Sequence, residues 1–467
     1  MTRAAQIAEF VSKAEYRSLS DTARLALKIR VLDALGCAVA AASSPVLQLL
    51  RAHTEEFGGV PRCSLIGGGR TAPDRAAFYN SALVRYPDFN DSYLAPNETC
   101  HPSDNLGAVL AACEYAGSTG KEFLTALAVA YQVQCRLSDV APVRAKGFDH
   151  TVQGAYAIAA GVSKALRLDA RQTANALAIC GTAFNALRVT RTGTLSNWKG
   201  LAYPNTAFCA THATFLAMRG ITGPPEVFEG NKGFMESISG PFEIDWTKED
   251  LERVRQTIVK RYNAEIHSQS AIEGIIELRN SRGIPVSTVK RVDVEIFDVA
   301  FRIIGGGEEG DKKTVITKEA ADHSLPYLIA VALIDGQVLP DQFTPERIRR
   351  DDVQSLLQKV YVRPARDLSE RFPRQVPCRL KITLSDGQSF SVGKTDYEGF
   401  LTRPMTWRDA VEKFRVLTAP HAVESACDPI VKTVNSLEDR PISDLTNLLG
   451  ARFAIRQPEE EVQYGGT

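Results

Sequence analysis

Four polar segments of the chain combine the residue types of general acid–base chemistry, and each interrupts apolar, alanine-rich surroundings. The first, residues 86–107, holds Asp88, Ser92, His101 and Ser103. A histidine titrates near neutral pH and can therefore accept or donate a proton, and a carboxylate can orient it. The segment predicts a site of proton transfer, although taken alone it is more typical of a capped, solvated surface loop.

The other three segments are cationic or carry a histidine. They span 146–154, 188–200 and 259–271, and they contribute His150, Arg188, Arg191, Lys199, Lys260, Arg261 and His267. Guanidinium and ammonium groups bind carboxylates, so these segments indicate a negatively charged substrate. Each segment also has a structural interpretation that stays open: a structural histidine beside a capping aspartate, an ordinary basic loop, and a charged hinge between domains.

Two glycine-rich stretches, 66–73 and 304–313, are weaker signals. The first lacks the Lys-Ser/Thr ending of a phosphate-binding loop, and the second is not followed by an apolar helix. We expect both to be loops that bind no phosphate.

The elements that position these segments are mainly helices. Apolar residues three and four positions apart predict them. The N-terminal 16 residues and the part after Pro404, where Thr406 can cap a helix with Asp409 in its first turn, are also expected to be helical. The other predicted helices are 22–42, 106–117, 120–138, 151–166, 170–182, 204–219, 318–335 and 351–359.

Strand patterns begin only near residue 285. Alternating apolar residues predict a strand over 289–297 and a hairpin over 379–392 that turns at Asp386-Gly387. We therefore predict a mainly α fold with an inserted α+β domain. The helical domain comprises residues 1–260 and 400–467, and the α+β domain comprises 261–399. The tail from residue 457 is expected to be disordered.

Composition excludes several classes of function. The 467 residues include 55 Lys plus Arg and 55 Asp plus Glu, so there is no bulk attraction to nucleic acid or to an anionic membrane. No segment is typical of a signal peptide or a membrane span. Nine dispersed cysteines indicate reduced thiols in the cytoplasm and argue against an iron–sulfur cluster, and the seven histidines lack zinc-binding spacing. We expect no metal and no cofactor.

The polar segments together resemble those of a known family. "DFNDSYLAPNETCHPSDNLGAVLAA", "GTLSNWKGLAYPNTAFCATHATFLAMRGITGPPEVFEGNKGF", "KRYNAEIHSQSAIEG" and "ADHSLPYLIAVALIDG" are similar, in this order, to motifs of the MmgE/PrpD family. That family contains 2-methylcitrate dehydratases, cis-aconitate decarboxylases and an iminodisuccinate epimerase. The resemblance implies a cofactor-free homodimer with a helical domain, an α+β lid domain and an active site between them.

Motif matching carries the family's catalytic residues to Asp88, Ser92, His101, His150, Lys199 and Lys260. Further substrate contacts are expected from Ser103, Arg188, Arg191, Arg261, His267 and His323. The decarboxylases carry a tyrosine at the position of Phe301 and a histidine at that of Glu265, so the resemblance favours the dehydratase branch.

The expected reaction is dehydration of 2-methylcitrate, or a related tricarboxylate such as citrate, to the unsaturated acid. We expect His101 to be the main acid/base group with Asp88 orienting it, His150 to be the second proton-transfer group, and Lys199 and Lys260 to hold carboxylates. Asn97 and Glu98 are expected to face solvent. Decarboxylation of cis-aconitate and epimerisation of an amino-dicarboxylate remain open, as does a non-catalytic helical binding protein.

Overall fold

The structure is a computed structural model that describes residues 1–421 and 424–451, with side chains except those of 424–426. It is mostly helical with a small mixed sheet, as the sequence predicts. The prediction of a disordered tail from residue 457 lies outside the described residues. No helix in the described ranges combines the length and apolar character needed to cross a bilayer.

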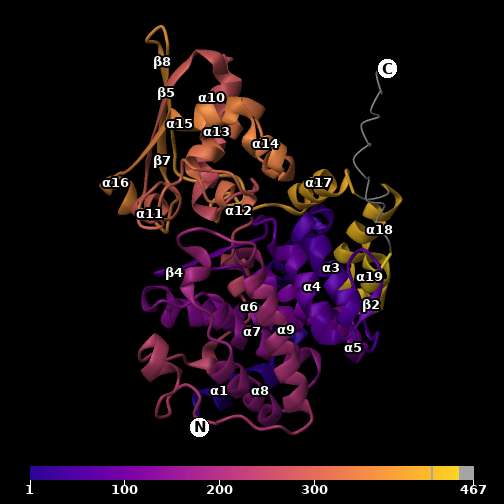
Figure 1. The fold of residues 1–467 in the computed structure, drawn as a ribbon. Coiled ribbons are helices and arrows are strands. Elements are labelled where there is room, and N and C mark those ends of the chain that lie inside the picture. Colours follow the sequence, from indigo (N-terminus) through magenta and orange to yellow (C-terminus); the bar gives the residue numbers. More distant parts are fainter. Residues whose placement is uncertain (422–423, 452–467) are drawn as a thin grey trace.

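Helices from both ends of the chain surround a first hydrophobic core. Figure 1 shows them as the indigo-to-magenta lower part, with the yellow C-terminal helices alongside. They are α1 (Arg3–Lys13), α2 (Asp21–Ala41), α3 (Pro45–Phe57), α4 (Pro73–Arg85), α5 (Leu106–Ala116), α6 (Gly120–Val140), α7 (Thr151–Ala165), α8 (Ala170–Ala183), α9 (Trp198–Met218), α17 (Trp407–Thr418), α18 (Glu424–Asn435) and α19 (Ile442–Leu449).

The predicted helices of this region are confirmed, with one informative difference. Helix α9 begins at Trp198 rather than 204 and contains Pro204 in its interior, so Lys199 lies in its first turn. Thr406 and Asp409 form the predicted capping box of α17. This helix packs against α2, which joins the two ends of the chain.

Small residues let these helices approach closely. A Cβ added at Gly107 of α5 would lie 2.4 Å from the backbone nitrogen of Ser81 in α4, and one at Gly154 of α7 would lie 2.5 Å from the Tyr203 ring of α9. Such distances are far below van der Waals contact, so only glycine fits. The alanine-rich composition therefore reflects tight helix packing around the first core.

A second hydrophobic core lies within residues 258–400. Its sheet has the order β6-β5-β7-β8, with β5 parallel to β6 and antiparallel to β7. In Figure 1 this is the orange upper part. Its elements are α10 (Gln269–Arg282), β5 (Val289–Ile296), α11 (Asp298–Ile304), α12 (Lys318–Ala321), α13 (Leu325–Asp335), α14 (Pro345–Arg349), α15 (Asp351–Gln358), β6 (Val360–Pro364), α16 (Arg366–Ser369), β7 (Cys378–Leu384) and β8 (Ser389–Lys394).

The strand predictions are confirmed. The alternating residues Val292, Val294 and Ile296 of β5 are buried, and β7 and β8 form the expected hairpin. Gly387 adopts a positive φ of 90° at its turn, which glycine does at little cost.

Two predictions about secondary structure need correction. The expected helix 318–335 is two helices, because the chain breaks at Asp322–Ser324 between α12 and α13. The helical region is also not all-helical: it contains the short hairpins β1 (Cys63–Ser64) with β2 (Arg70–Thr71) and β3 (Tyr93–Ala95) with β4 (Glu98–Cys100). Apolar periodicity does not report such short pairings.

We propose that the two cores are two domains, with residues 1–260 and 400–467 forming one and 261–399 the other. The chain changes from the first core to the second between Val254 and Ala264, where Ile258 packs in the second core and Val259 in the first. It returns between Phe400 and Met405.

Candidate active site

A small cavity of about 50 Å³ is bounded by residues from both sides of the junction between the two cores, and nearly all of its lining side chains are ionisable. All four predicted polar segments contribute to it, as does the loop after α11. Its lining residues are Arg85, Asp88, Glu98, Thr99, His101, Arg144, His150, Arg188, Arg191, Glu265, Ile266, His267, Ile303, Glu309 and His323. Ligand sites commonly lie between domains, so this cavity is the candidate active site.

The loop between α4 and α5 is held by backbone pairing rather than spread over the surface. Strands β3 and β4 pair Tyr93 with Cys100. Just before this hairpin, Ser92 and Ile258 exchange two backbone hydrogen bonds of 2.8 Å. The pairing ties the loop that carries His101 to the segment that leads into Lys260.

Of the two residues at the tip of this hairpin that we expected to face solvent, one is exposed and the other is buried. Asn97 is exposed and takes a positive φ of 63°, which asparagine tolerates in turns. Glu98, which we expected to face solvent, is buried. Its carboxylate accepts hydrogen bonds of 3.1 Å from the backbone N–H groups of Val143 and Arg144, and these bonds offset the loss of water.

His101 is held as a neutral base. Its Nδ1 lies 2.8 Å from the carbonyl oxygen of Asp91 and 3.0 Å from the hydroxyl of Ser92. A carbonyl only accepts, so Nδ1 carries the hydrogen and the lone pair is at Nε2. Burial, with the positive charges of Arg85 and Lys260, lowers the pKa of His101 well below its ordinary value. The imidazole is therefore neutral at neutral pH, with its single ring hydrogen on Nδ1.

His150 has a carboxylate where His101 has a carbonyl. Its Nδ1 lies 3.0 Å from Asp149 Oδ1, and the Nε of Arg191 binds Asp149 Oδ2 at 2.6 Å. The two imidazoles meet edge to face with ring centroids 5.5 Å apart. Burial lowers the pKa of His150 to about 4, against the opposing effect of Asp149. Of the two imidazoles, His150 has the partner that stabilises a proton.

Asp88 is directed toward cations, which corrects the expectation that it orients His101. Its Oδ1 accepts from Arg85 Nη1 at 2.8 Å and from Lys260 Nζ at 2.6 Å, and Lys260 also binds its carbonyl oxygen at 2.8 Å. Burial raises the pKa of Asp88, but the nearby cations outweigh it and hold the pKa well below its ordinary value. Its φ of 60° is uncommon for a residue with a side chain.

The break between α12 and α13 supplies the partners of Lys199. The ammonium of Lys199 lies 2.5 Å from Asp322 Oδ1, 2.9 Å from His323 Nδ1 and 3.8 Å from Asp88 Oδ2. Burial lowers the pKa of Lys199 to about 8, despite Asp322 and Asp88. Lys199 and Lys260 are not among the lining residues, so the structure places both lysines behind the wall with their charges already paired.

Asp88, Asp322 and His323 also form a group with metal-ligand spacing, within 4.8 Å of one another, the only such group that the described residues contain. The ammonium of Lys199 contacts or approaches all three. A cationic side chain therefore already takes the position that a metal ion would need.

Two predicted substrate contacts lie elsewhere. The N–H of Ser103 donates to Asp91 Oδ1 at 2.9 Å and its hydroxyl accepts from Asn90 at 2.8 Å, so Ser103 supports the loop. Arg261 is about a third exposed and lies 3.7 Å from Glu398, away from the lining residues. Both depart from expectation because nearer polar groups satisfy them.

His267 does line the cavity, with Nδ1 2.5 Å from Glu265 Oε1 and its ring against Phe297 and Phe372. The site residues that sequence reasoning missed as contributors are Arg85, Arg144, Glu309 and Asp322. Arg144 and Glu309 are 165 positions apart, so no local spacing indicates that they pair, whereas Arg85 lies three positions from its partner Asp88 and Asp322 lies next to His323.

We expect the free energy of unfolding to fall as the pH is lowered from about 6.5 towards 4. The pKa of His150 is about 4 when folded and near 6.5 when unfolded, so the unfolded chain binds more protons in this window. That shift corresponds to ~3 kcal/mol, and His101, with a lowered pKa, acts in the same direction. Urea unfolding across the window measures the slope. His150→Gln should flatten it, and an unchanged slope would contradict the assignment.

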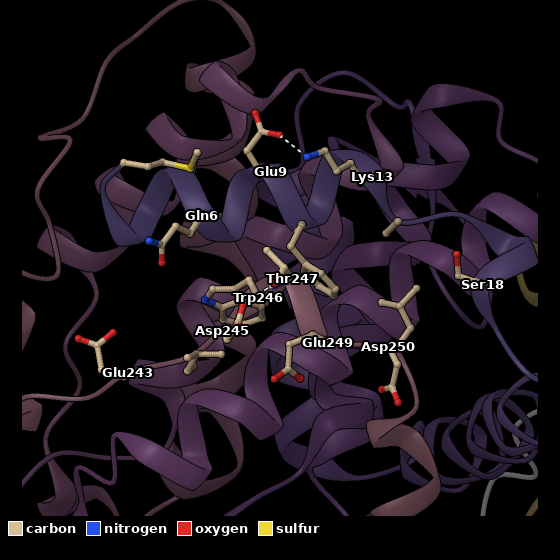
Figure 2. A pocket seen from close by; sticks show the side chains of 15 residues that line it. Gln6, Glu9, Lys13, Ser18, Glu243, Asp245, Trp246, Thr247, Glu249 and Asp250 are labelled. Atoms are coloured by element: carbon tan, nitrogen blue, oxygen red, sulfur yellow. Dashed lines mark hydrogen bonds and ion pairs between the residues drawn. The ribbon is translucent and has the colours of Figure 1, made fainter.

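A larger cavity of about 730 Å³ lies elsewhere, between α1 and residues 243–251. Figure 2 shows Trp246 beneath α1, with Glu9 paired to Lys13 and further carboxylates around the rim. Carboxylates outnumber cations among its lining residues, and it contains no histidine. It offers neither an acid–base pair nor attraction for an anion, so the smaller cavity remains the candidate.

The chain is similar to known proteins over most of its length. Models of the MmgE/PrpD N-terminal domain and the MmgE/PrpD C-terminal domain match residues 5–247 and 262–439. A 2-methylcitrate dehydratase of Salmonella typhi is 28% identical over 418 residues, which cover 83% of this chain and 82% of the relative. A cis-aconitate decarboxylase of Mus musculus is 25% identical over 449 residues, 90% of this chain and 88% of the relative.

Proposed function

The chain belongs to the MmgE/PrpD family, and from this premise we propose that it is a lyase that dehydrates 2-methylcitrate, or a related tricarboxylate such as citrate. Relatives named 2-methylcitrate dehydratase cover most of the chain at 27–28% identity. The proposed chemistry is general acid–base elimination by the protein's own side chains, without a cofactor.

The observation that carries the proposal is the pair of imidazoles with different Nδ1 partners. His101, with Nδ1–H bound by a carbonyl, presents a free lone pair at Nε2 and serves as the base that removes a proton beside a carboxylate. His150, backed by Asp149, serves as the acid that protonates the departing hydroxide. The negative charge of an entering substrate raises both pKa values, which gives His150 its proton and strengthens His101 as a base.

The arginines of the cavity hold the substrate in this proposal. Arg85, Arg144, Arg188 and Arg191 line the wall, and guanidinium groups bind carboxylates with two parallel hydrogen bonds. Lys199 and Lys260 lie behind the cavity wall, where they hold Asp88, Asp322 and the surrounding backbone in place. Their positive charge also favours the negative charge that develops when the proton is removed.

Glu265 favours dehydration over decarboxylation. It lines the cavity and pairs with His267 at the position where the decarboxylases carry a histidine. A carboxylate at this point changes the charge presented to the substrate, so we rank decarboxylation of cis-aconitate second.

A substrate panel tests the proposal. With 2-methylcitrate or citrate, we expect ultraviolet absorbance to rise as a conjugated alkene forms, and mass spectrometry to show loss of water. Release of carbon dioxide from cis-aconitate would replace the dehydratase assignment with a decarboxylase. Epimerisation of an amino-dicarboxylate, or turnover of none of these acids, would also overturn it.

A further inference from the structure

The loop after α11 places one carboxylate on two arginines of the candidate site. Glu309 Oε1 accepts from Arg144 Nη2 at 2.8 Å and from Arg188 Nη2 at 2.6 Å. We propose that Arg144 and Arg188 form a carboxylate-binding subsite, and that Glu309 occupies it until a carboxylate of the substrate takes its place. The inference rests on the proposed function for the identity of the ligand as a polycarboxylate.

The backbone around the two arginines forms a built site. The N–H of Arg188 donates to the carbonyl of Gly147 at 2.9 Å, and Phe148 and Leu187 form an antiparallel bridge. The buried carboxylate of Glu98 accepts from the N–H of Arg144. These bonds hold the 144–148 and 187–188 segments side by side, and none of them involves Glu309.

The charge balance of the cavity explains why a carboxylate must leave. The lining residues include four arginines and four carboxylates, the latter being Asp88, Glu98, Glu265 and Glu309. The lining residues alone therefore present a tricarboxylate with no excess of positive charge. Displacement of one internal carboxylate leaves an excess of positive charge on the wall and vacates two guanidinium groups with donors in the right orientation.

Glu309 differs from the other three carboxylates in its partners, which are the two arginines proposed to bind the substrate. Asp88 is held by Arg85 and Lys260. Glu98 is bound to backbone N–H groups, and Glu265 to the imidazole and N–H of His267. The side-chain hydrogen bonds of Glu309 go only to Arg144 and Arg188 within the part of the chain that the structure describes.

The segment that carries Glu309 is suited to movement. It belongs to the glycine-rich stretch 304–313, where Gly306 and Gly310 have positive φ values of 99° and 90°. A Cβ added at either glycine would meet nothing within 4 Å, so both positions face open space. Glycine accommodates large φ and ψ changes at low cost, which allows Glu309 to swing out while the arginines stay in place.

Binding of tricarballylate tests the exchange apart from turnover, because this tricarboxylate has no hydroxyl group to eliminate. Titration calorimetry should give a Kd about tenfold or more lower for Glu309→Gln than for the parent, since the competing charge-assisted bonds are gone. The matched control is Glu308→Gln, an exposed neighbour in the same loop, which should bind like the parent. Adding Arg144→Met to Glu309→Gln should abolish the gain.

Equal or weaker binding by Glu309→Gln, including no binding by either protein, overturns the proposal, as does a gain that survives Arg144→Met. The parent protein supplies a second measurement: saturating tricarballylate should speed amide hydrogen exchange over residues 305–313, and unchanged or slower exchange would contradict displacement. Tighter binding by Glu309→Gln without turnover of any tricarboxylate would support the subsite and reject the proposed dehydratase. Turnover of a tricarboxylate without tighter binding by Glu309→Gln would support the proposed dehydratase and reject the subsite.

Discussion

Replacing His101 with alanine is expected to lower kcat by about 10²–10⁴-fold, the usual contribution of a general acid–base group. Its Nδ1 hydrogen is directed to the carbonyl of Asp91, so the proposed base is a single atom, Nε2. Because this group acts on the reacting hydrogen and not on the carboxylates, KM should change much less than kcat.

The matched control is His53→Ala, on the exposed face of α3 and outside the lining residues, which should retain parent activity. Steady-state kinetics with the substrate from the panel measures both variants, and circular dichroism checks that they fold. If His101→Ala turns over at nearly the parent rate, the base lies elsewhere, and His150 becomes the first alternative.

Asp88→Asn is expected to lower the free energy of unfolding by about 3–5 kcal/mol, the cost of leaving buried charges without their partner. Asp88 is buried between Arg85 and Lys260, and asparagine keeps its shape while removing its charge. Asparagine also tolerates the φ of 60°, so the loss reports the electrostatic contact and not the backbone.

Urea-induced unfolding measures this loss, with Glu370→Gln as the control. Glu370 pairs with Arg366 on the surface, where removing one partner should change stability by about 0–1 kcal/mol. Adding Lys260→Met to Asp88→Asn should recover part of the loss, because it removes one of the two unpaired charges. An Asp88→Asn protein as stable as the parent would mean that Asp104 and Asp322 neutralise both cations unaided.

Local patterns in the chain were sufficient for most of the elements. Helix α17 and strand β5 follow from apolar periods of about 3.6 and 2 residues, and the turn before β8 from Asp386-Gly387. These signals are readable because a helix or hairpin is stabilised by neighbours within a few positions. Residues from all four predicted polar segments line one cavity.

Predictions from local patterns were wrong where residues of the site interrupt the pattern. The expected helix 318–335 is interrupted at Asp322 and His323, whose side chains face Lys199 instead of continuing an apolar stripe. Glu98 reads as a surface residue, but two backbone N–H groups far along the chain make its burial possible. The residues next to Asp322 and Glu98 in the sequence do not indicate these distant partners.

Local patterns in the sequence were therefore enough for most of the helices, for strands β5, β7 and β8, and for many of the side chains able to move protons or bind carboxylates. The tertiary structure alone decided which of them are paired, which are neutral and which face the cavity. The partners Asp88 and Lys260 are 172 positions apart, and Lys199 and Asp322 are 123 apart. Protonation and orientation depend on burial and on such distant charges, and only packing of the two cores sets both.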